Sequence, residues 1–234
     1  MTSEICVSEV ISSADNSNCY PLYIFADEED LALSEAGNNF TPEFLELVAK
    51  KLKLKQDRAS GLPEGINAEE LFYYIYAIFY SPTYRKRFAE HLRIDFPRVP
   101  LTGKEALFKT LAKFGSALVE LHLLRSKFKG KNQPSFVGGE AQIVMKPTWA
   151  AGKIRINEAS EAGFEGIDED VWNFQVGSYR VCEKWLKDRK GRSITKSDAE
   201  KFSALATSIA GTIGLMGDID KLINSHGGWP KAFQ

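Results

Sequence analysis

The sequence predicts an α+β fold, a mostly helical bundle with a small inserted antiparallel sheet. Two observations carry this prediction. Between residues 41 and 127, apolar residues recur every three or four positions, which is the period of a helix buried on one face. After residue 127, short segments alternate apolar and polar residues between Gly-, Pro- and Ser-rich turns, which is typical of strands. The length of 234 residues and the apolar fraction of 44% are those of an ordinary globular chain.

The first 40 residues are expected to form two short strands and an acidic loop. Residues 5–11 and 20–25 are the strand candidates, because apolar residues there are separated by a turn rich in Ser, Asn and Asp. Residues 27–39 are acidic and have few apolar anchors, which is typical of a loop.

Four helices are predicted between residues 41 and 126, each opened by a capping signal. Their expected ranges begin at residues 42, 68, 82 and 105 and extend to about residues 55, 80, 93 and 126. The capping signals are, in order, Thr41-Pro42, Asn67 with Glu70, Ser81-Pro82, and Thr102 with Glu105. The second helix is aromatic around most of its circumference, so it should be central and buried.

The sequence after residue 127 predicts strands at residues 142–145, 153–156 and 173–176. A helix is then predicted at 179–189, terminated by Gly191. Ser197 with Glu200 should open the last helix, which reaches residue 209 or, at most, 224.

Three glycines, Gly211, Gly214 and Gly217, fall in this last helix, where each costs about 1 kcal/mol relative to alanine. Close packing against a neighbouring element is the first explanation, and a kinked or broken helix is the second.

Two long blocks carry a resemblance to a known family. Residues 71–124 contain an aromatic run, a basic amphipathic helix, a proline-spaced loop and a second long helix, and residues 171–192 read VWNFQVGSYRVCEKWLKDRKGR. In this order the blocks resemble the C-terminal specificity domain of type ISP restriction-modification enzymes and related long adenine-specific DNA methyltransferases. The resemblance runs from about residue 5 to about residue 221. It implies a target-recognition domain that reads DNA sequence and carries no chemistry.

The resemblance also implies the organisation of the chain and its partners. Residues 1–40 would form the junction with a methyltransferase module that lies upstream, and residues 41–234 the target-recognition domain, with a helical part at 41–127 and a mixed part at 128–234. S-adenosylmethionine is expected as the cofactor of the missing module, and none is expected for this chain. The partners are then double-stranded DNA and the upstream module.

Catalysis by this chain alone is not expected. It lacks the Asn-Pro-Pro-aromatic tetrapeptide that methyltransferases acting on exocyclic amines use, a Gly-rich cofactor turn and a phosphate-binding loop. His91, His122 and His226 have no spacing for a metal site, so no metal is predicted.

The chain is predicted to be cytoplasmic and bacterial, with no membrane partner. Its three cysteines are odd in number and form no C-x-x-C motif, which is typical of reduced thiols in a cytosolic protein. The apolar stretch at residues 205–216 is too short to span a bilayer.

The net charge of −1 conceals a strong asymmetry. Residues 1–46 hold ten acidic residues and no lysine or arginine. Residues 84–131 hold twelve basic against four acidic residues, and residues 180–192 hold six against two. Local charge, rather than total charge, governs binding to nucleic acid, although basic runs on helices are often only solvated faces.

The candidate DNA-binding residues come from these two basic regions. Gln and Arg can make paired hydrogen bonds to adenine and guanine edges, whereas Lys usually contacts phosphate. The candidates are Arg98, Lys109, Lys113, Gln175, Ser178, Tyr179, Arg180, Lys184, Lys187, Arg189, Lys190 and Arg192. Arg98 lies between Pro97 and Pro100, so it is either a rigidly presented DNA contact or an ion-pair partner of Asp95. Trp172 and Trp185 are predicted to be core residues.

The predicted function is sequence-specific recognition of double-stranded DNA, as the target-recognition domain of a bacterial restriction-modification DNA adenine methyltransferase. Two other classes stay open. The chain could be a protein-interaction module that docks to a catalytic subunit or domain through its aromatic helix and acidic N-terminal region. It could also be an enzyme of unrecognised type.

Overall fold

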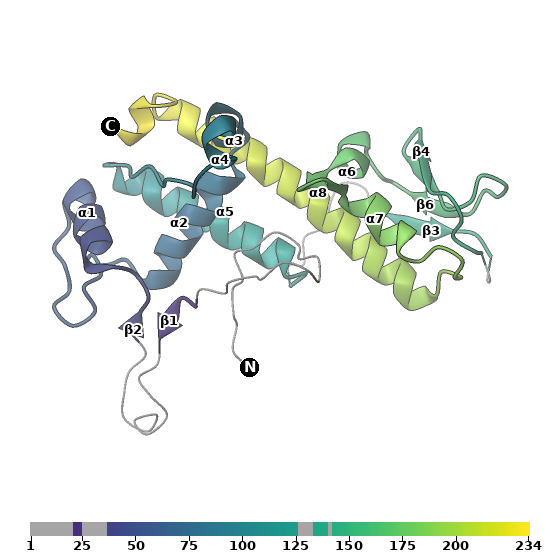
Figure 1. The fold of residues 1–234 in the computed structure, drawn as a ribbon, viewed down its shortest axis with the longest axis horizontal. Coiled ribbons are helices and arrows are strands. Elements are labelled where there is room, and N and C mark those ends of the chain that lie inside the picture. Colours follow the sequence, from purple (N-terminus) through teal and green to yellow (C-terminus); the bar gives the residue numbers. More distant parts are fainter. Residues whose placement is uncertain (1–20, 25–36, 126–132, 140–141) are drawn as a thin grey trace, which may run out of the picture. The chain divides into compact units, whose positions relative to one another are not determined.

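The computed structural model describes residues 21–24, 37–125, 133–139 and 142–234. These residues fall into two compact units (Figure 1). Unit 1 takes in the described residues up to Ser116 together with Met216–Gln234, and Unit 2 takes in those of Ala117–Leu215. Helices and small antiparallel sheets make up both, so the predicted α+β class is confirmed. The domain boundaries expected from the sequence stay predictions.

Unit 1 is mainly helical. Its elements are β1 (Tyr23–Ile24), β2 (Gly37–Asn38), α1 (Pro42–Leu52), α2 (Ala68–Tyr80), α3 (Pro82–Arg87), α4 (Ala89–Leu92), the first part of α5 (Glu105–His122), the last part of α8 (Lys196–Ser225) and the 3₁₀ helix η2 (Lys231–Phe233). The strands β1 and β2 form an antiparallel pair.

Three of the four predicted helix caps in this unit are confirmed. Thr41 and Ser81 each accept a hydrogen bond from a backbone N–H of the helix that follows, at 3.3 and 3.1 Å. Asn67 and Glu70 form a reciprocal capping box at the start of α2.

The pairing of Thr102 with Glu105 is wrong. The Thr102 hydroxyl accepts from the backbone N–H of Lys104 and donates to the carbonyl oxygen of Ala232 at 2.8 Å. This side chain therefore ties the start of α5 to η2 at the C-terminus, a long-range bond that no local motif reveals.

Helix lengths in this unit differ from the prediction where the backbone leaves helical geometry. The α1 helix ends at Leu52 because Lys53 takes a left-handed conformation with φ of 57°. The basic helix expected after Ser81 is two short helices, α3 and α4, separated at Phe88. The α5 helix ends at His122, about one turn before the predicted residue 126.

The core of Unit 1 forms where α2 packs on α5. The rings of Tyr74 and Phe108 stack with centroids 4.7 Å apart, and both residues are buried. The α2 backbone also comes very close to Gly115 of α5, since an added Cβ would lie 1.8 Å from the carbonyl oxygen of Tyr73. As expected, α2 is central, although its Phe72, Tyr76 and Tyr80 are only partly buried.

Unit 2 combines a small sheet with helices. Its sheet has the antiparallel order β3-β6-β5-β4. The described elements are β3 (Ser135–Val137), β4 (Thr148–Ala150), β5 (Lys153–Arg155), β6 (Gly163–Glu165), α6 (Glu169–Asn173), β7 (Gln175–Val176), β8 (Tyr179–Arg180), α7 (Val181–Lys187), the last turns of α5 and the N-terminal two thirds of α8.

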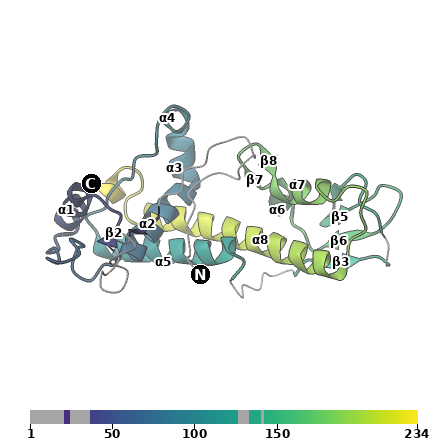
Figure 2. The same cartoon turned by 60° about the horizontal axis from the view of Figure 1, so that its bottom comes forward.

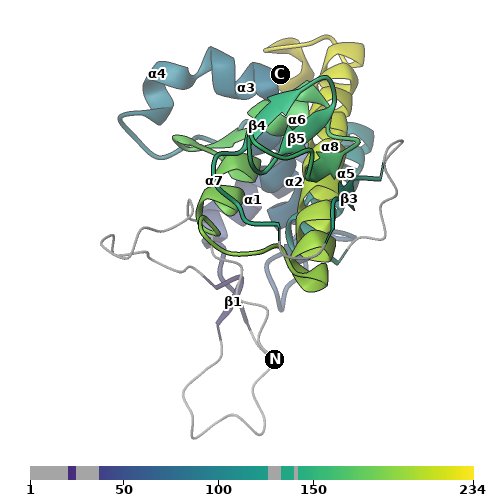
Figure 3. The same cartoon turned by 90° about the vertical axis from the view of Figure 1, so that its right-hand side faces the viewer.

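The core of Unit 2 gathers around Phe202 of α8. The sheet contributes Phe164, whose ring centroid lies 4.2 Å from that of Phe202, and α7 contributes Trp185 at 5.1 Å. Trp172 is 6% exposed and Trp185 packs partly buried against the same cluster, so the prediction that both are core residues is confirmed. Figures 1 and 3 show the sheet and α7 gathered beside this part of α8.

Two strand predictions in Unit 2 are wrong in detail. Residues 153–155 form a hairpin with Thr148–Ala150, whereas Ile143 of the expected strand makes only an isolated bridge to Ser193. The strand predicted at 173–176 begins at Gln175, because Asn173 still belongs to α6.

The helix predicted at 179–189 is also shorter than expected. Tyr179 and Arg180 pair with Val176 and Gln175 as strand β8, and α7 begins only at Val181. The sequence has no helix breaker after Gly177, so the competing β-hairpin was not apparent.

The long helix α8 is continuous over 30 residues. It begins one residue before the predicted cap, because Thr195 and Asp198 exchange the capping hydrogen bonds assigned to Ser197 and Glu200. An added Cβ at Gly214 or Gly217 would meet nothing within 4 Å, so close packing does not explain these two glycines.

Among the described residues, α8 is the one helix long and apolar enough to cross a membrane, judged by length and composition only. Core helices of soluble proteins share this property. Here Phe202, Ala206 and Ile209 belong to the buried cluster of Unit 2. The expectation of no membrane partner stays a prediction.

Candidate nucleic-acid interface

Four of the predicted site residues lie on the hairpin β7–β8. Gln175 pairs with Arg180 and Val176 pairs with Tyr179. Gly177 takes a φ of 57°, as the first central residue of a two-residue hairpin turn can require, and Ser178 completes the turn. Gln175, Ser178, Tyr179 and Arg180 are all exposed.

The base of this hairpin is anchored in the core of Unit 2. The backbone N–H of Val181 donates to the carbonyl oxygen of Phe174 at 3.1 Å, which extends the ladder by one rung. Both of these residues pack against the buried cluster. The hairpin therefore presents polar side chains from a fixed support.

Helix α7 carries its lysines in ion pairs along its own surface. Lys184 contacts Asp188 and Lys187 contacts Glu183, each at 2.8 Å and each four residues apart. Lys184 also lies over the ring of Tyr179, 5.8 Å from its centroid. Exposed pairs of this kind contribute little to stability, so either lysine can exchange its carboxylate for another anion at small cost.

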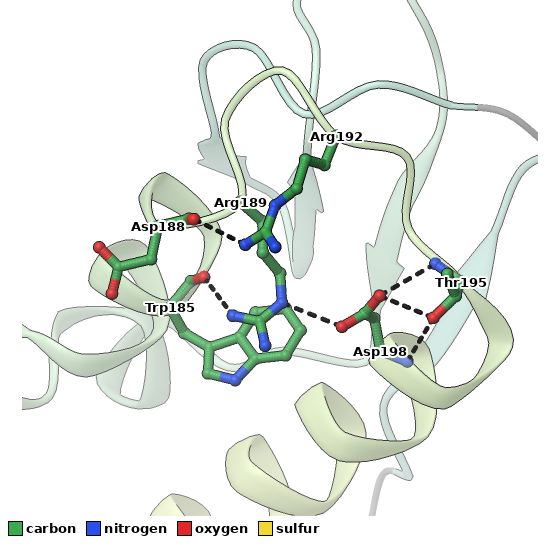
Figure 4. A network of polar contacts seen from close by, with 6 residues as sticks. All are labelled: Trp185, Asp188, Arg189, Arg192, Thr195 and Asp198. Carbon is green, nitrogen blue, oxygen red and sulfur yellow. Dashed lines mark hydrogen bonds and ion pairs between the residues drawn. The ribbon is translucent and has the colours of Figure 1, made fainter.

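Arg189 is held by the fold (Figure 4). Its guanidinium stacks 3.4 Å from the centroid of the Trp185 ring and donates to the Trp185 carbonyl oxygen at 3.1 Å. Its Nε donates to Asp198 at 3.0 Å. Hydrogen bonds from the Thr195 hydroxyl and from Arg189 lower the pKa of Asp198 to about 2. These contacts join the end of α7 to the start of α8.

The remaining cations of this block have fewer partners. Arg192 donates one hydrogen bond to the carbonyl oxygen of Asp188 at 2.8 Å (Figure 4). Arg180 and Lys190 are exposed and form no ion pair with any residue that the structure describes. Within the part of the chain that the structure describes, the positive charge of this block that has no paired carboxylate thus lies at Arg180 on the hairpin and just beyond the end of α7.

The other predicted residues belong to Unit 1. Lys109 pairs with Glu105 at 3.4 Å, and Lys113, one turn further along α5, is exposed. Arg98 lies 3.8 Å from Asp95, with side chains 82% and 52% exposed, so the ion pair expected as one alternative exists but is open to solvent.

The sequence missed two apolar residues beside Arg98. Ile94 and Phe96 are 86% and 80% exposed, the highest values among the large apolar side chains that the structure describes as exposed. One signal could have revealed them. Both fall after the inner stripe of Tyr84, Phe88 and Leu92 has ended, so no helical face remains to bury them.

The described residues offer no cluster of three or more His, Cys, Asp and Glu side chains that could hold a metal. Cys182 is fully buried, and its Sγ lies 3.8 Å from the carbonyl oxygen of Val171. Burial raises the pKa of this thiol to about 12. A thiol of this kind is unreactive, because thiolate is the nucleophilic form.

The two units therefore define an α+β module that presents polar and cationic side chains on an anchored hairpin and on helical surfaces. The chain belongs to the family of type ISP C-terminal specificity domains, whose model matches residues 1–211. The resemblance drawn from the two sequence blocks is thus confirmed.

Solved structures share the fold. A DrdV–DNA complex matches with a TM-score of 0.61 and 18% identity over 87% of this chain. The ATP-dependent type ISP restriction-modification enzyme LlaBIII bound to DNA matches with a TM-score of 0.56 and 18% identity over 86% of this chain. The matches span 21% and 14% of those chains. None of the curated proteins matches this chain.

Proposed function

We propose that this chain recognises specific sequences in double-stranded DNA, as the target-recognition domain of a restriction-modification DNA adenine methyltransferase. The observation that carries the proposal is the hairpin β7–β8, which is anchored at its base and exposes Gln175 and Arg180. It occurs in a chain of the specificity-domain family, whose solved neighbours include DNA complexes.

The hairpin has the shape and chemistry that base reading requires. A two-stranded ribbon fits the major groove of B-DNA. Gln175 and Arg180 are direct cross-strand partners. Their side chains therefore leave the same face of the ribbon about 5 Å apart. Adjacent base pairs are about 3.4 Å apart, so the two side chains can reach neighbouring base edges. Gln suits adenine and Arg suits guanine.

Phosphate contacts would come from the surrounding cations. The exposed pairs of Lys184 and Lys187 exchange readily for phosphate. Lys190 and Arg192 extend the cationic surface beyond α7, and Ser178 and Tyr179 add hydroxyl groups at the hairpin. Arg189 differs from these residues, because its contacts give it a structural role.

The chemistry would belong to a different part of the parent protein. An upstream methyltransferase module would bind S-adenosylmethionine and modify an adenine flipped out of the duplex. This chain would hold the duplex beside that module without catalysing a step. We place the parent protein in the bacterial cytoplasm, where such a module would meet DNA.

The test is competitive binding to a cognate duplex, mapped on the full-length parent enzyme, and to a scrambled duplex. Gln175→Ala and Arg180→Ala should each weaken cognate binding by about 1–3 kcal/mol and leave scrambled binding unchanged. Lys109→Ala with Lys113→Ala should weaken both equally, because phosphate contacts carry no sequence information.

Arg155→Ala is the matched control, since Arg155 is an exposed arginine on the sheet of the same unit. It should change neither affinity. Equal losses on cognate and scrambled duplexes for the two hairpin variants would show that base reading is wrongly assigned to this hairpin.

Docking to a catalytic subunit or domain is the second candidate function. The rings of Phe72, Tyr76 and Tyr80 form a partly exposed row along α2, with successive centroids 5.6 and 4.9 Å apart. Aromatic side chains are enriched at protein interfaces. Binding to a partner protein through this row would depend only weakly on salt, which separates it from DNA binding.

A further inference from the structure

The loop after α4 exposes two large apolar side chains within three residues. Ile94 is 86% exposed and Phe96 is 80% exposed, whereas the other exposed large apolar residues that the structure describes lie between 45% and 53%. Single exposed apolar residues are normal on protein surfaces, whereas apolar surface that gathers at one place marks an interaction site.

The loop is held firmly on both sides of these residues. On the N-terminal side, the backbone N–H groups of Ile94 and Asp95 both donate to the carbonyl oxygen of His91 at 3.0 Å. On the C-terminal side, Tyr84 donates its hydroxyl to the carbonyl oxygen of Arg98 at 2.8 Å. The buried Tyr74 does the same to Pro100 at 2.6 Å. Hydrogen bonds therefore anchor the backbone on both sides of the tip.

The tip lies at the end of an arm. Figures 2 and 3 show α3 leading outward to α4, with the loop beyond it before the chain returns. The backbone of this loop thus lies at the outer end of the arm.

The surroundings of the tip are cationic. Residues 85–98 contain five lysines and arginines against two acidic residues. Arg93 and Arg98 flank the apolar pair, and each makes only a long, solvent-exposed ion pair, at 3.5 Å to Glu90 and 3.8 Å to Asp95. Phosphate oxygens can replace these carboxylates at little cost.

We propose that Ile94 and Phe96 form an apolar wedge that inserts between stacked base pairs of duplex DNA, while Arg93 and Arg98 contact the phosphates on either side. Proteins that kink DNA insert Phe, Leu, Ile or Met in this way and use cationic residues beside the wedge. The proposal rests on the proposed function, because it requires a chain that binds duplex DNA.

The charge pattern favours DNA over a protein partner. The centre of a protein interface is more apolar than the rest of the surface and is depleted in charged residues such as Asp, Glu and Lys. Here Arg93, Asp95 and Arg98 interrupt the apolar residues along a narrow tip. Two apolar side chains are enough for a wedge, because a wedge needs little apolar surface and the flanking cations can contact phosphates.

The experiment measures binding of the 234-residue chain to two duplexes of the same sequence, one intact and one with a central abasic site. An abasic site removes the unstacking cost of insertion in advance, so the wild type should prefer it by about tenfold. Phe96→Ala, and Ile94→Ala with Phe96→Ala, should lose most of this preference while still binding the intact duplex. Phe96→Leu should retain it.

Leu47→Ala is the control, because Leu47 is an exposed apolar residue on α1, 49% accessible, in the same unit. It should leave the preference unchanged. The bend of the duplex, measured from the distance between labels at its two ends, is a second readout. Insertion should bend the wild-type complex by about 20–90°, and Phe96→Ala should reduce the bend.

Two results would overturn the wedge alone: equal wild-type affinity for both duplexes, or an abasic preference that survives both alanine variants. In either case, salt-dependent binding of the intact duplex would leave the proposed function standing. If the wild type binds neither duplex, the proposed function fails and the wedge fails with it.

Discussion

Asp198 shows how a single carboxylate joins two helices in Unit 2. It accepts hydrogen bonds from the Thr195 hydroxyl at 2.6 Å, from Arg189 at 3.0 Å and from the backbone N–H of Thr195 at 3.3 Å, while Thr195 caps α8 by accepting from the backbone N–H of Asp198. Because these hydrogen bonds stabilise the ionised carboxylate in the folded state, the pKa of Asp198 falls from 3.8 to about 2. Its stabilising effect is complete above the ordinary pKa and disappears as the pH falls through about 2.

We therefore expect Asp198→Asn to be less stable than the wild type at pH 6, with the difference shrinking between pH 4 and pH 2. Urea unfolding midpoints at pH 6, 4 and 2.5 measure this. Asp170→Asn, on the exposed surface of α6, is the control and should follow the wild type. A stability difference that stays constant down to pH 2.5 would contradict the role of the ionised carboxylate.

Residue roles were the hardest feature to predict from the sequence. Arg189 was grouped with its neighbouring cations because its partner, Asp198, lies on another helix. The Trp185 ring four residues earlier was a local signal for stacking. The cap of α8 was misplaced because Ser197 and Glu200 satisfy the same capping pattern as Thr195 and Asp198.

At the scale of elements, Gly115 lies where two helices pack closely, whereas Gly214 lies on an open helix surface. Gly115→Ala would place a Cβ 1.8 Å from the Tyr73 carbonyl oxygen, so α5 and α2 would have to move apart. We expect a loss of about 3 kcal/mol or more in the free energy of unfolding, as for severe overpacking.

Gly214→Ala on α8 is the matched control, since its Cβ would meet nothing within 4 Å. It should raise stability by about 0.5–1 kcal/mol through the higher helix propensity of alanine. Chemical denaturation of both variants tests the pair. A neutral Gly115→Ala would mean that the two helices do not pack as closely as the structure shows.

The sequence predicted elements better than contacts between them. Caps with local partners, such as Asn67 with Glu70, were found because both groups lie within one turn. The need for glycine at Gly115 cannot be predicted from the sequence, because it depends on the opposing backbone. The sequence predicts the strand β7 but places β8 in a helix, because Tyr179 and Arg180 fit either state and only the pairing with Gln175 and Val176 decides.

At the scale of the whole molecule, duplex binding should depend strongly on salt. If about six lysines and arginines neutralise phosphates, the slope of log K against log salt concentration should be about −5. Lys187→Ala with Lys190→Ala should make the slope shallower by about 2, one for each lost contact. Lys146→Ala, an exposed lysine of Unit 2 paired with Glu158, is the control. A flat wild-type slope would favour the docking module.

The family could be predicted from the sequence, and the site only in part. Two long blocks in fixed order identified the specificity domain, because order and length together are far more specific than any short motif. The exposure of Ile94 and Phe96 is not evident from the sequence, since it is decided by where the helices around them end.

The buried thiol of Cys182 has a practical consequence. Its Sγ is inaccessible to reagents while Unit 2 is folded. In a variant with Cys6→Ser and Cys19→Ser it would be the only cysteine of the chain. Labelling at mildly alkaline pH would then proceed only through opening of the core between α6, α7 and α8. The rate of labelling would report how often that opening occurs. Slower labelling in the presence of DNA would measure how much the bound duplex stabilises this unit.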